Sequence, residues 1–341
     1  MSLKIDVFNH IFPKPFFDRL QEVIVNRGAV KRWLHIPFLH DLDVRFRRLE
    51  EFGPDYRQVL SLSAPPIESI NPDRETTIDL ARLANDSMAA TVQAHPHRFP
   101  GFLASLPLNH ADDSVVELER AVTELGALGV QVFSNVNGLP LDDDRFWPLF
   151  ETAARLRCPI FLHPARPAGF ADYASETTSK FEIWWTFGWP YETSAAMQRL
   201  VFSRLFDRLP DIRIVAHHLG AMIPFFEGRV GYGLDQLGTR TADEDYGALL
   251  ASLKKRPIDY FKMFWGDTAV FGSQAATLCG LSFFGVDQVV FASDAPFDPE
   301  GGPLYIRETI RVIDALDIDA AGRAKIYQHN AERLFGRTFK A

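Results

Sequence analysis

Eight short apolar runs alternate along this chain with segments of helical periodicity, and this alternation limits its folds more than any other feature. Each run is bounded by glycine, proline or charge and lacks the polar–apolar alternation of a half-exposed strand. Continuous apolar runs of this length are typical of parallel strands buried on both faces. We expect strands at residues 3–8, 57–62, 99–105, 129–134, 159–163, 212–217, 260–266 and 288–293.

The segments between the runs have the spacing of amphipathic helices. Val115, Leu118, Val122 and Leu125, for example, recur every three or four residues and so share one helical face. Strand–helix alternation repeated eight times predicts a single (β/α)8 TIM barrel, one domain over residues 1–341. An open doubly wound sheet is the alternative, but no glycine-rich GxGxxG turn follows any run. Loop insertions are expected at residues 14–45, 164–192 and 231–258.

Composition restricts the classes of partner. With 47% apolar and 23% charged residues the chain can bury a large core, and its net charge of −8 argues against a nucleic-acid or anionic-membrane partner. A small carboxylate substrate is still allowed, because a few buried cationic side chains can make the electrostatic potential of a pocket positive. The two cysteines, Cys158 and Cys279, form no disulfide framework, and no apolar stretch is long enough to cross a membrane. We therefore expect a cytoplasmic protein.

Histidines and aspartates follow several of the expected strands. In a TIM barrel the carboxyl ends of the strands form the rim that carries the chemistry. Imidazole and carboxylate groups together suit Zn²⁺, Mn²⁺ or Fe²⁺, with a position left open for water or substrate. The residues at these ends are His10, His163, His217, His218, Asp267 and Asp294.

Three of these positions, and one pair of histidines elsewhere in the chain, need separate treatment. His217 and His218 are neighbours at a strand end, so their side chains should point in opposite directions and only one should face the centre. His95 and His97 have the HxH spacing common in metal sites, but they precede the third strand. They therefore belong to the opposite end of the barrel and are not expected to bind metal. Asp267 is either a functional group or a helix cap.

Several stretches occur in an order that is similar to one known family. They are "IDVFNHIFP", "RQVLSLS", "IFLHP", "WPYETSAAMQRLVFSRLFDRLPDIRIVAHHLGAMIPFFEGR", "FWGDTAVFG", "FASDAPF" and "NAERLF". On these stretches the chain resembles the amidohydrolase superfamily, in the branch that holds aminocarboxymuconate semialdehyde decarboxylase and γ-resorcylate decarboxylase. The resemblance spans nearly the whole chain and does not specify a substrate.

The resemblance implies a metal site and a catalytic pair. It assigns His10, His163 and Asp294 to the metal, which is expected to be a divalent ion, with zinc ahead of manganese. His218 lies six residues before Pro224, the spacing of the family's general acid/base histidine, and Asp294 is the second catalytic candidate. A homodimer is one possible assembly.

The resemblance also suggests residues that contact the substrate. Arg45 is similar in position to an arginine that binds the substrate carboxylate, and Arg47 is a rival for that role. Trp185, five residues before Pro190, resembles an aromatic residue that lines the pocket.

Phe8 departs from the family pattern, which places histidine or glutamate at this position. Residues i and i+2 of a strand share a face, so Phe8 should point into the barrel beside His10 and line the substrate pocket. A phenyl ring cannot ligate a metal. The usual ligand set therefore loses a member, and we expect metal occupancy to be in doubt.

Three functions compete at this stage. The first is metal-dependent nonoxidative decarboxylation of a small carboxylated aromatic or aromatic-derived acid. The second is metal-dependent hydrolysis of a lactone, ester or amide, in which the metal lowers the pKa of a bound water. The third is a metal-free binding protein that has lost catalysis, which the phenylalanine at position 8 would explain.

Overall fold

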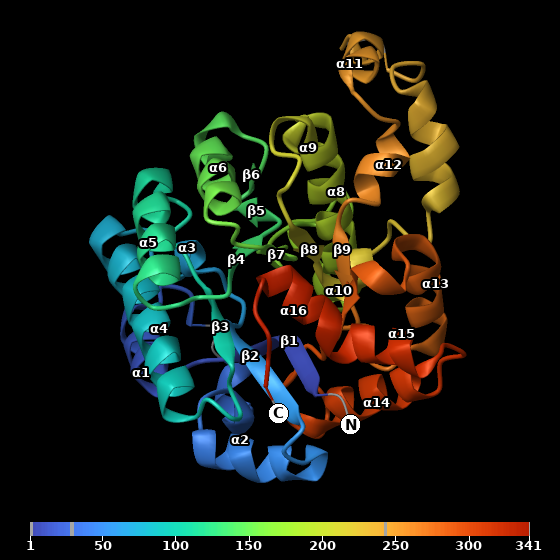
Figure 1. Ribbon diagram of the computed structural model, residues 1–341. Helices are drawn as coiled ribbons and strands as arrows, with labels where there is room; N and C mark the ends of the chain where they lie inside the picture. The colour runs from blue at the N-terminus through green and yellow to red at the C-terminus, as the bar shows by residue number, and fades with distance from the viewer. Residues whose placement is uncertain (1–2, 28–30, 242–243, 341) are drawn as a thin grey trace.

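Eight parallel strands form the centre of the molecule and helices surround them (Figure 1), as a (β/α)8 barrel requires. The computed structural model describes residues 3–27, 31–241 and 244–340. Neighbouring strands in the sheet follow the order of the chain. The eight strands are β1 (Lys4–Ile11), β2 (Tyr56–Leu62), β3 (Gly101–Ala104), β4 (Gly129–Phe133), β7 (Ile160–His163), β8 (Ile214–Ala216), β9 (Trp265–Asp267) and β10 (Val289–Val290).

The barrel is closed by hydrogen bonds between β1 and the segment that continues β10. The amide of Val7 donates to the carbonyl of Phe291 over 2.9 Å, and the amide of Asp294 donates to the carbonyl of Phe8 over 3.1 Å. These bonds bring the first and last strands side by side. The carboxyl end of β1 and Asp294 therefore meet at one rim, although nearly three hundred residues separate them in the chain.

The helices and one small hairpin complete the structure. The hairpin consists of β5 (Asn135–Val136) and β6 (Leu139–Pro140). The helices are α1 (Lys14–Val23), α2 (Leu42–Leu49), α3 (Ile67–Ile70), α4 (Arg74–Ala94), α5 (Ala111–Thr123), α6 (Trp147–Arg155), α7 (Ile183–Thr186), α8 (Gly188–Phe202), α9 (Leu205–Arg208), α10 (His217–Gly220), α11 (Tyr246–Ser252), α12 (Pro257–Phe261), α13 (Gln274–Phe284), α14 (Pro303–Asp314), α15 (Ala320–Ala324) and α16 (Asn330–Phe335).

The expected strands are confirmed in number and order, with one local correction. The run at 260–266 is not strand throughout, because Tyr260 and Phe261 belong to α12 and only Trp265 and Gly266 enter β9. Pro257 opens α12 at its first turn, where its fixed φ favours a helix and its missing N–H costs nothing. The aromatic residues that follow are then buried as part of a helix.

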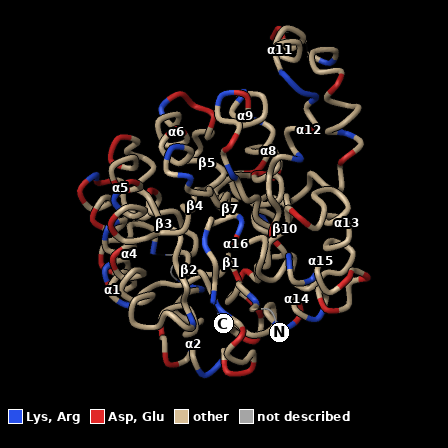
Figure 2. The backbone as a smooth tube through the Cα atoms, in the orientation of Figure 1, with Lys and Arg blue, Asp and Glu red and all other residues tan. Residues whose placement is uncertain are grey.

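Apolar side chains form two layers of core. An outer layer packs the strands against the helices, and an inner cluster fills the barrel. Val59, Leu103, Phe161 and Val215 belong to this inner cluster, as does Phe8. Charged residues of both signs are interspersed over the outer helices in Figure 2. Among the described residues, no helix has the length and apolar character that a membrane crossing requires.

Candidate metal centre

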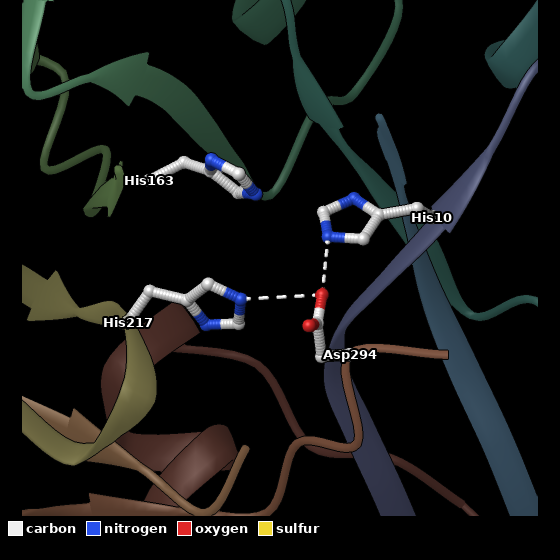
Figure 3. A group of neighbouring side chains, drawn as sticks. All are labelled: His10, His163, His217 and Asp294. Carbon is white, nitrogen blue, oxygen red and sulfur yellow. Dashed lines mark hydrogen bonds and ion pairs between the residues drawn. The ribbon is translucent and has the colours of Figure 1, made fainter. Parts of the chain in front are cut away.

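Four side chains from four strand ends converge at one rim of the barrel (Figure 3). His10 lies in β1, His163 ends β7, His217 follows β8 and Asp294 follows β10. One potential ligand atom from each lies within 4.8 Å of the others, and all four residues are buried. The expected set of His10, His163 and Asp294 is therefore brought together, and His217 joins it.

Main-chain oxygens fix the orientation of two of the imidazoles. Nδ1 of His10 lies 2.9 Å from the carbonyl oxygen of Leu62, and Nδ1 of His163 lies 2.7 Å from that of Pro164. A carbonyl can only accept, so each Nδ1 carries the proton and each Nε2 keeps a free lone pair. Anchoring of the second ring nitrogen in this way is typical of metal-ligating histidines.

A carboxylate fixes the third imidazole. Nδ1 of His217 lies 2.5 Å from Oδ2 of Asp267, and both side chains are fully buried. The other oxygen of Asp267 accepts from the amide of Ala269 over 3.0 Å, so the carboxylate is itself held in place. Asp267 thus orients His217, and this contact is a more specific role than a helix cap.

The donor set fits a metal ion. Nε2 of His10 lies 2.9 Å and Nε2 of His217 lies 3.4 Å from the same oxygen, Oδ1 of Asp294. When Nδ1 carries the proton, Nε2 and the carboxylate are both acceptors, and a cation between them is needed to make the approach favourable. Three imidazoles and one carboxylate are ligands that Zn²⁺, Mn²⁺ and Fe²⁺ accept. The residues present therefore suit a divalent transition-metal ion.

The local electrostatics keep two of the candidate ligands, Asp294 and His163, in their ligating forms. Burial would raise the pKa of Asp294, but the imidazoles of His10 and His217, whose Nε2 atoms lie 2.9 and 3.4 Å from its Oδ1, hold that pKa well below its usual value. Burial, together with the nearby His217 and His10, lowers the pKa of His163 well below its usual value. Asp294 is therefore ionised and His163 neutral near pH 7, as metal binding requires.

Asp294 and His218 are among the residues at this rim that have left-handed backbone conformations. Asp294 has φ 60° and His218 has φ 55°, values that side-chain-bearing residues seldom adopt. Such conformations persist where the surrounding structure imposes them, and they are concentrated at functional sites. At Asp294 part of that constraint comes from the hydrogen bond that its amide donates to the carbonyl of Phe8.

Phe8 faces the barrel interior, as expected, and forms an apolar wall of the centre. It is fully buried, and its ring centroid lies 5.3 Å from that of His10 and 4.2 Å from that of His217. The expectation that Phe8 leaves the site short of ligands is not borne out. His217 supplies a fourth donor that the sequence had not assigned to the metal.

His218 lies beside the four-residue group and is not part of it. Its ring centroid is 3.9 Å from that of His217 and 5.4 Å from that of Phe271. Its Nδ1 is buried and has no hydrogen-bond partner among the described residues. Burial, with a contribution from His217, lowers the pKa of His218 to about 4. The catalytic role expected for His218 stays a prediction.

Strand alternation could have identified His217, rather than His218, as the histidine that faces the barrel interior. Val215 belongs to the inner cluster of the barrel, so a residue two positions later continues the inward face. The strand ends at Ala216, and the chain then turns at the left-handed His218. The family spacing to Pro224 favoured His218, whereas the alternation along the strand favours His217.

Arg45 is fully buried, and protein groups occupy its guanidinium. It donates to Oε1 of Gln58 over 2.9 Å, to the carbonyl of His10 over 2.8 Å and to Oδ1 of Asn9 over 2.5 Å. These bonds support β1 from behind the metal centre. Contact between Arg45 and a substrate carboxylate stays a prediction that this geometry does not favour. Its rival, Arg47, is exposed on α2.

Two aromatic residues of the 164–192 insertion lie near the metal centre, one in direct ring contact with a candidate ligand and one further out. Trp189 approaches directly, with its ring centroid 5.4 Å from that of His163. Trp185 lies further out, 6.4 Å from the ring of Phe271, which in turn contacts His218. The pocket-lining role expected of Trp185 stays a prediction, and Trp189 is the insertion residue in ring contact with a candidate ligand.

Comparison with known proteins shows the family to which the chain belongs. A model of the amidohydrolase family matches residues 66–337. The chain is 31% identical over 313 residues to 2-amino-3-carboxymuconate-6-semialdehyde decarboxylase of Dictyostelium discoideum, covering 87% of this chain and 82% of that one. It is 35% identical over 303 residues to gamma-resorcylate decarboxylase of Rhodococcus jostii, covering 86% and 87%.

One solved structure is similar over nearly its whole length. It is a dihydroxybenzoic acid decarboxylase from Polaromonas, determined with bound manganese and the inhibitor 2-nitroresorcinol. It shares 28% identity with this chain at a TM-score of 0.78, and the match covers 98% of this chain and 97% of that one.

Proposed function

We propose, from the premise that this chain belongs to the amidohydrolase family, that it is a metal-dependent nonoxidative decarboxylase of a small carboxylated aromatic or aromatic-derived acid. The observation that carries the proposal is the group of three anchored imidazoles and one carboxylate. The names of the similar proteins, which are decarboxylases of such acids, support the reaction class.

The candidate ligands are His10, His163 and Asp294, with His217 as the fourth donor or as a proton carrier beside them. A divalent ion held by these residues would supply Lewis acidity toward the substrate. Phe8 closes one side with an apolar ring and so keeps water from that face.

Nonoxidative decarboxylation needs a proton at the carbon that bears the carboxylate. Protonation there converts the ring or ene system into an electron sink, the carbon–carbon bond then breaks, and CO₂ leaves while the bonding electrons return to the ring. His217 is suited to deliver this proton, because Asp267 holds its Nδ1 and its Nε2 faces the cluster. His218 and Asp294 are the alternative donors named by the sequence, and Asp294 is the less favourable because it is ionised.

Three finer assignments belong to the same proposal. We propose that the ion is zinc or manganese, and the manganese in the Polaromonas structure supports the second. A cytoplasmic location is consistent with the free cysteines Cys158 and Cys279. A homodimer is consistent with the exposed aromatic rings of Phe225 and Tyr232, each 78% exposed, and the mass in solution measured by light scattering tests it.

Parallel assays of two reactions test the proposal. The metal-loaded protein is incubated with hydroxybenzoates and with lactones, and release of CO₂ is compared with ring opening. We expect CO₂ from at least one hydroxybenzoate, abolished by a chelator and restored by Mn²⁺ or Zn²⁺. Ring opening of a lactone without any CO₂ release would instead support the hydrolase, and neither reaction in metal-loaded protein would support the binding protein.

A further inference from the structure

A small buried cavity lies at the barrel rim beside the metal centre and has no assigned role. Its volume is about 10 Å³, which is room for one water-sized group. Three of its lining side chains present a buried polar atom without a hydrogen-bond partner among the described residues. These atoms are Oε1 of Glu68, Oγ of Ser105 and Oε1 of Gln131.

Three unsatisfied polar atoms around one small space are unusual. A buried polar atom without a partner costs about 1–3 kcal/mol, so native structures seldom leave several together. Glu68 is 3% exposed, Ser105 6% and Gln131 3%, and bulk solvent therefore does not satisfy them. A group that enters the cavity and bonds to all three would recover this cost.

The cavity shares its walls with the metal centre. The carbonyl of Leu62 accepts both from Nδ1 of His10 over 2.9 Å and from Nε2 of Gln131 over 3.1 Å. Phe133 lines the cavity and lies two residues after Gln131 on β4, so both face the barrel interior. The ring of Phe133 lies 4.9 Å from that of His163. The cavity is therefore adjacent to two of the candidate ligands.

The chemistry of the three atoms defines the group that fits. Nε2 of Gln131 donates to the carbonyl of Leu62, so Oε1 of Gln131 is the atom that faces the cavity without a partner, and it needs a hydrogen-bond donor. Oγ of Ser105 can donate or accept. Burial raises the pKa of Glu68 to about 8, so this carboxyl is neutral near pH 7 and can donate its proton. A group that both donates and accepts, and that carries no charge, satisfies all three.

We propose that this cavity, formed by Glu68, Ser105 and Gln131, is a specificity subsite that takes one neutral hydroxyl substituent of the substrate ring. A single water fills it in the absence of substrate. The volume excludes a second carboxylate, which has two oxygens and a charge that no cation in this cavity balances. The inference rests on the proposed function and specifies the class of ring acid that the site selects.

Ligand binding tests the subsite separately from turnover. Dissociation constants are measured by calorimetry for benzoate and for its 2-, 3- and 4-hydroxy derivatives, on manganese-loaded wild type and variants. Ser105→Ala removes an unpartnered hydroxyl, and Glu68→Leu removes the unpartnered carboxyl, so both should fold. Thr309→Val is the matched control, because its Oγ1 is also buried and unpartnered but it does not line the cavity.

The expected result is that one hydroxy isomer binds the wild type more tightly than benzoate does. In Ser105→Ala and Glu68→Leu this preference should fall about 3- to 10-fold, with benzoate affinity and the Thr309→Val control unchanged. An undiminished preference in both variants would overturn the subsite and leave the decarboxylase proposal standing. No binding of any benzoate to the wild type would overturn the subsite and also the ring-acid class of the proposed function.

Discussion

Oδ2 of Asp267 lies 2.5 Å from Nδ1 of His217, and both side chains are fully buried. A carboxylate in this position fixes the tautomer and orientation of the imidazole and increases its basicity. Burial alone would lower the pKa of His217, but the carboxylates of Asp267 and Asp294 outweigh it and raise the pKa to about 9. Asp267 therefore acts on the metal centre through His217.

Replacement of Asp267 tests this positioning role. Asp267→Asn keeps the size of the side chain but removes the charge, so His217 can rotate or change tautomer. We expect the kcat/KM for CO₂ release to fall by about 10- to 100-fold. Asp235→Asn, at a partly exposed carboxylate paired with Arg256, is the control and should leave the rate unchanged. A rate within twofold of wild type for Asp267→Asn would contradict the role.

The two adjacent histidines should differ in their effect on activity. His217 faces Asp294, whereas His218 lies outside the group of four. We expect His217→Ala to lower the initial rate of CO₂ release by at least about 100-fold and His218→Ala by less than about tenfold. His97→Ala, at an exposed histidine, controls for the loss of an imidazole. A larger fall in the rate of CO₂ release in His218→Ala than in His217→Ala would contradict this and would support His218 as the general acid/base that the family spacing indicates.

Arg45 should behave as a structural residue when it is replaced. Arg45→Met removes donors from the carbonyl of His10 and from Oδ1 of Asn9, both buried. We expect the free energy of unfolding in urea to fall by about 3 kcal/mol. Arg47→Met, on the exposed side of α2, should change it by less than about 0.5 kcal/mol. Unchanged stability with a raised KM in Arg45→Met would show that Arg45 binds substrate instead.

Glu68 should make the stability of the protein depend on pH. Its pKa is about 8 in the folded protein against 4.5 for the free side chain, because burial disfavours the charged form. The stabilising contribution of the protonated carboxyl is fully present below pH 4.5 and is lost as the pH rises through 8. Complete loss of this contribution lowers the free energy of unfolding by about 5 kcal/mol.

Urea unfolding between pH 4.5 and 8 measures this dependence. Glu68→Gln is neutral throughout, so its stability relative to wild type should rise across that interval. Glu75→Gln, at an exposed carboxyl on the next helix, should follow the wild-type curve. Parallel curves for wild type and Glu68→Gln would mean that Glu68 is ionised in the folded protein.

The repeated pattern of the chain was sufficient to predict the barrel. Eight buried parallel strands produce eight short apolar runs, and their order followed directly. The prediction of a strand at 260–266 was wrong in part, because apolar periodicity does not distinguish a short buried strand from a short buried helix. Pro257 at the first turn of α12 favours the helix.

The site was predictable only where strand ends define it. Strand ends identify six candidate residues, and the family resemblance selects His10, His163 and Asp294 among them. The choice between His217 and His218 depends on a turn whose φ values a sequence does not display. The surroundings of Arg45 depend on packing of α2 against β1 and β2, and the cavity at Glu68 depends on packing near the ends of β2, β3 and β4, which no local pattern specifies.

The central claim is that His10, His163 and Asp294 bind a divalent ion, with His217 beside them as a fourth donor or a proton carrier. The most direct test is the metal content per chain, measured by plasma mass spectrometry on protein purified without chelators, beside His163→Ala. We predict about one equivalent of zinc or manganese in the wild type and its loss in the variant. Absence of metal from both proteins, even after supplementation with Zn²⁺ and Mn²⁺, would contradict the claim and the mechanism built on it.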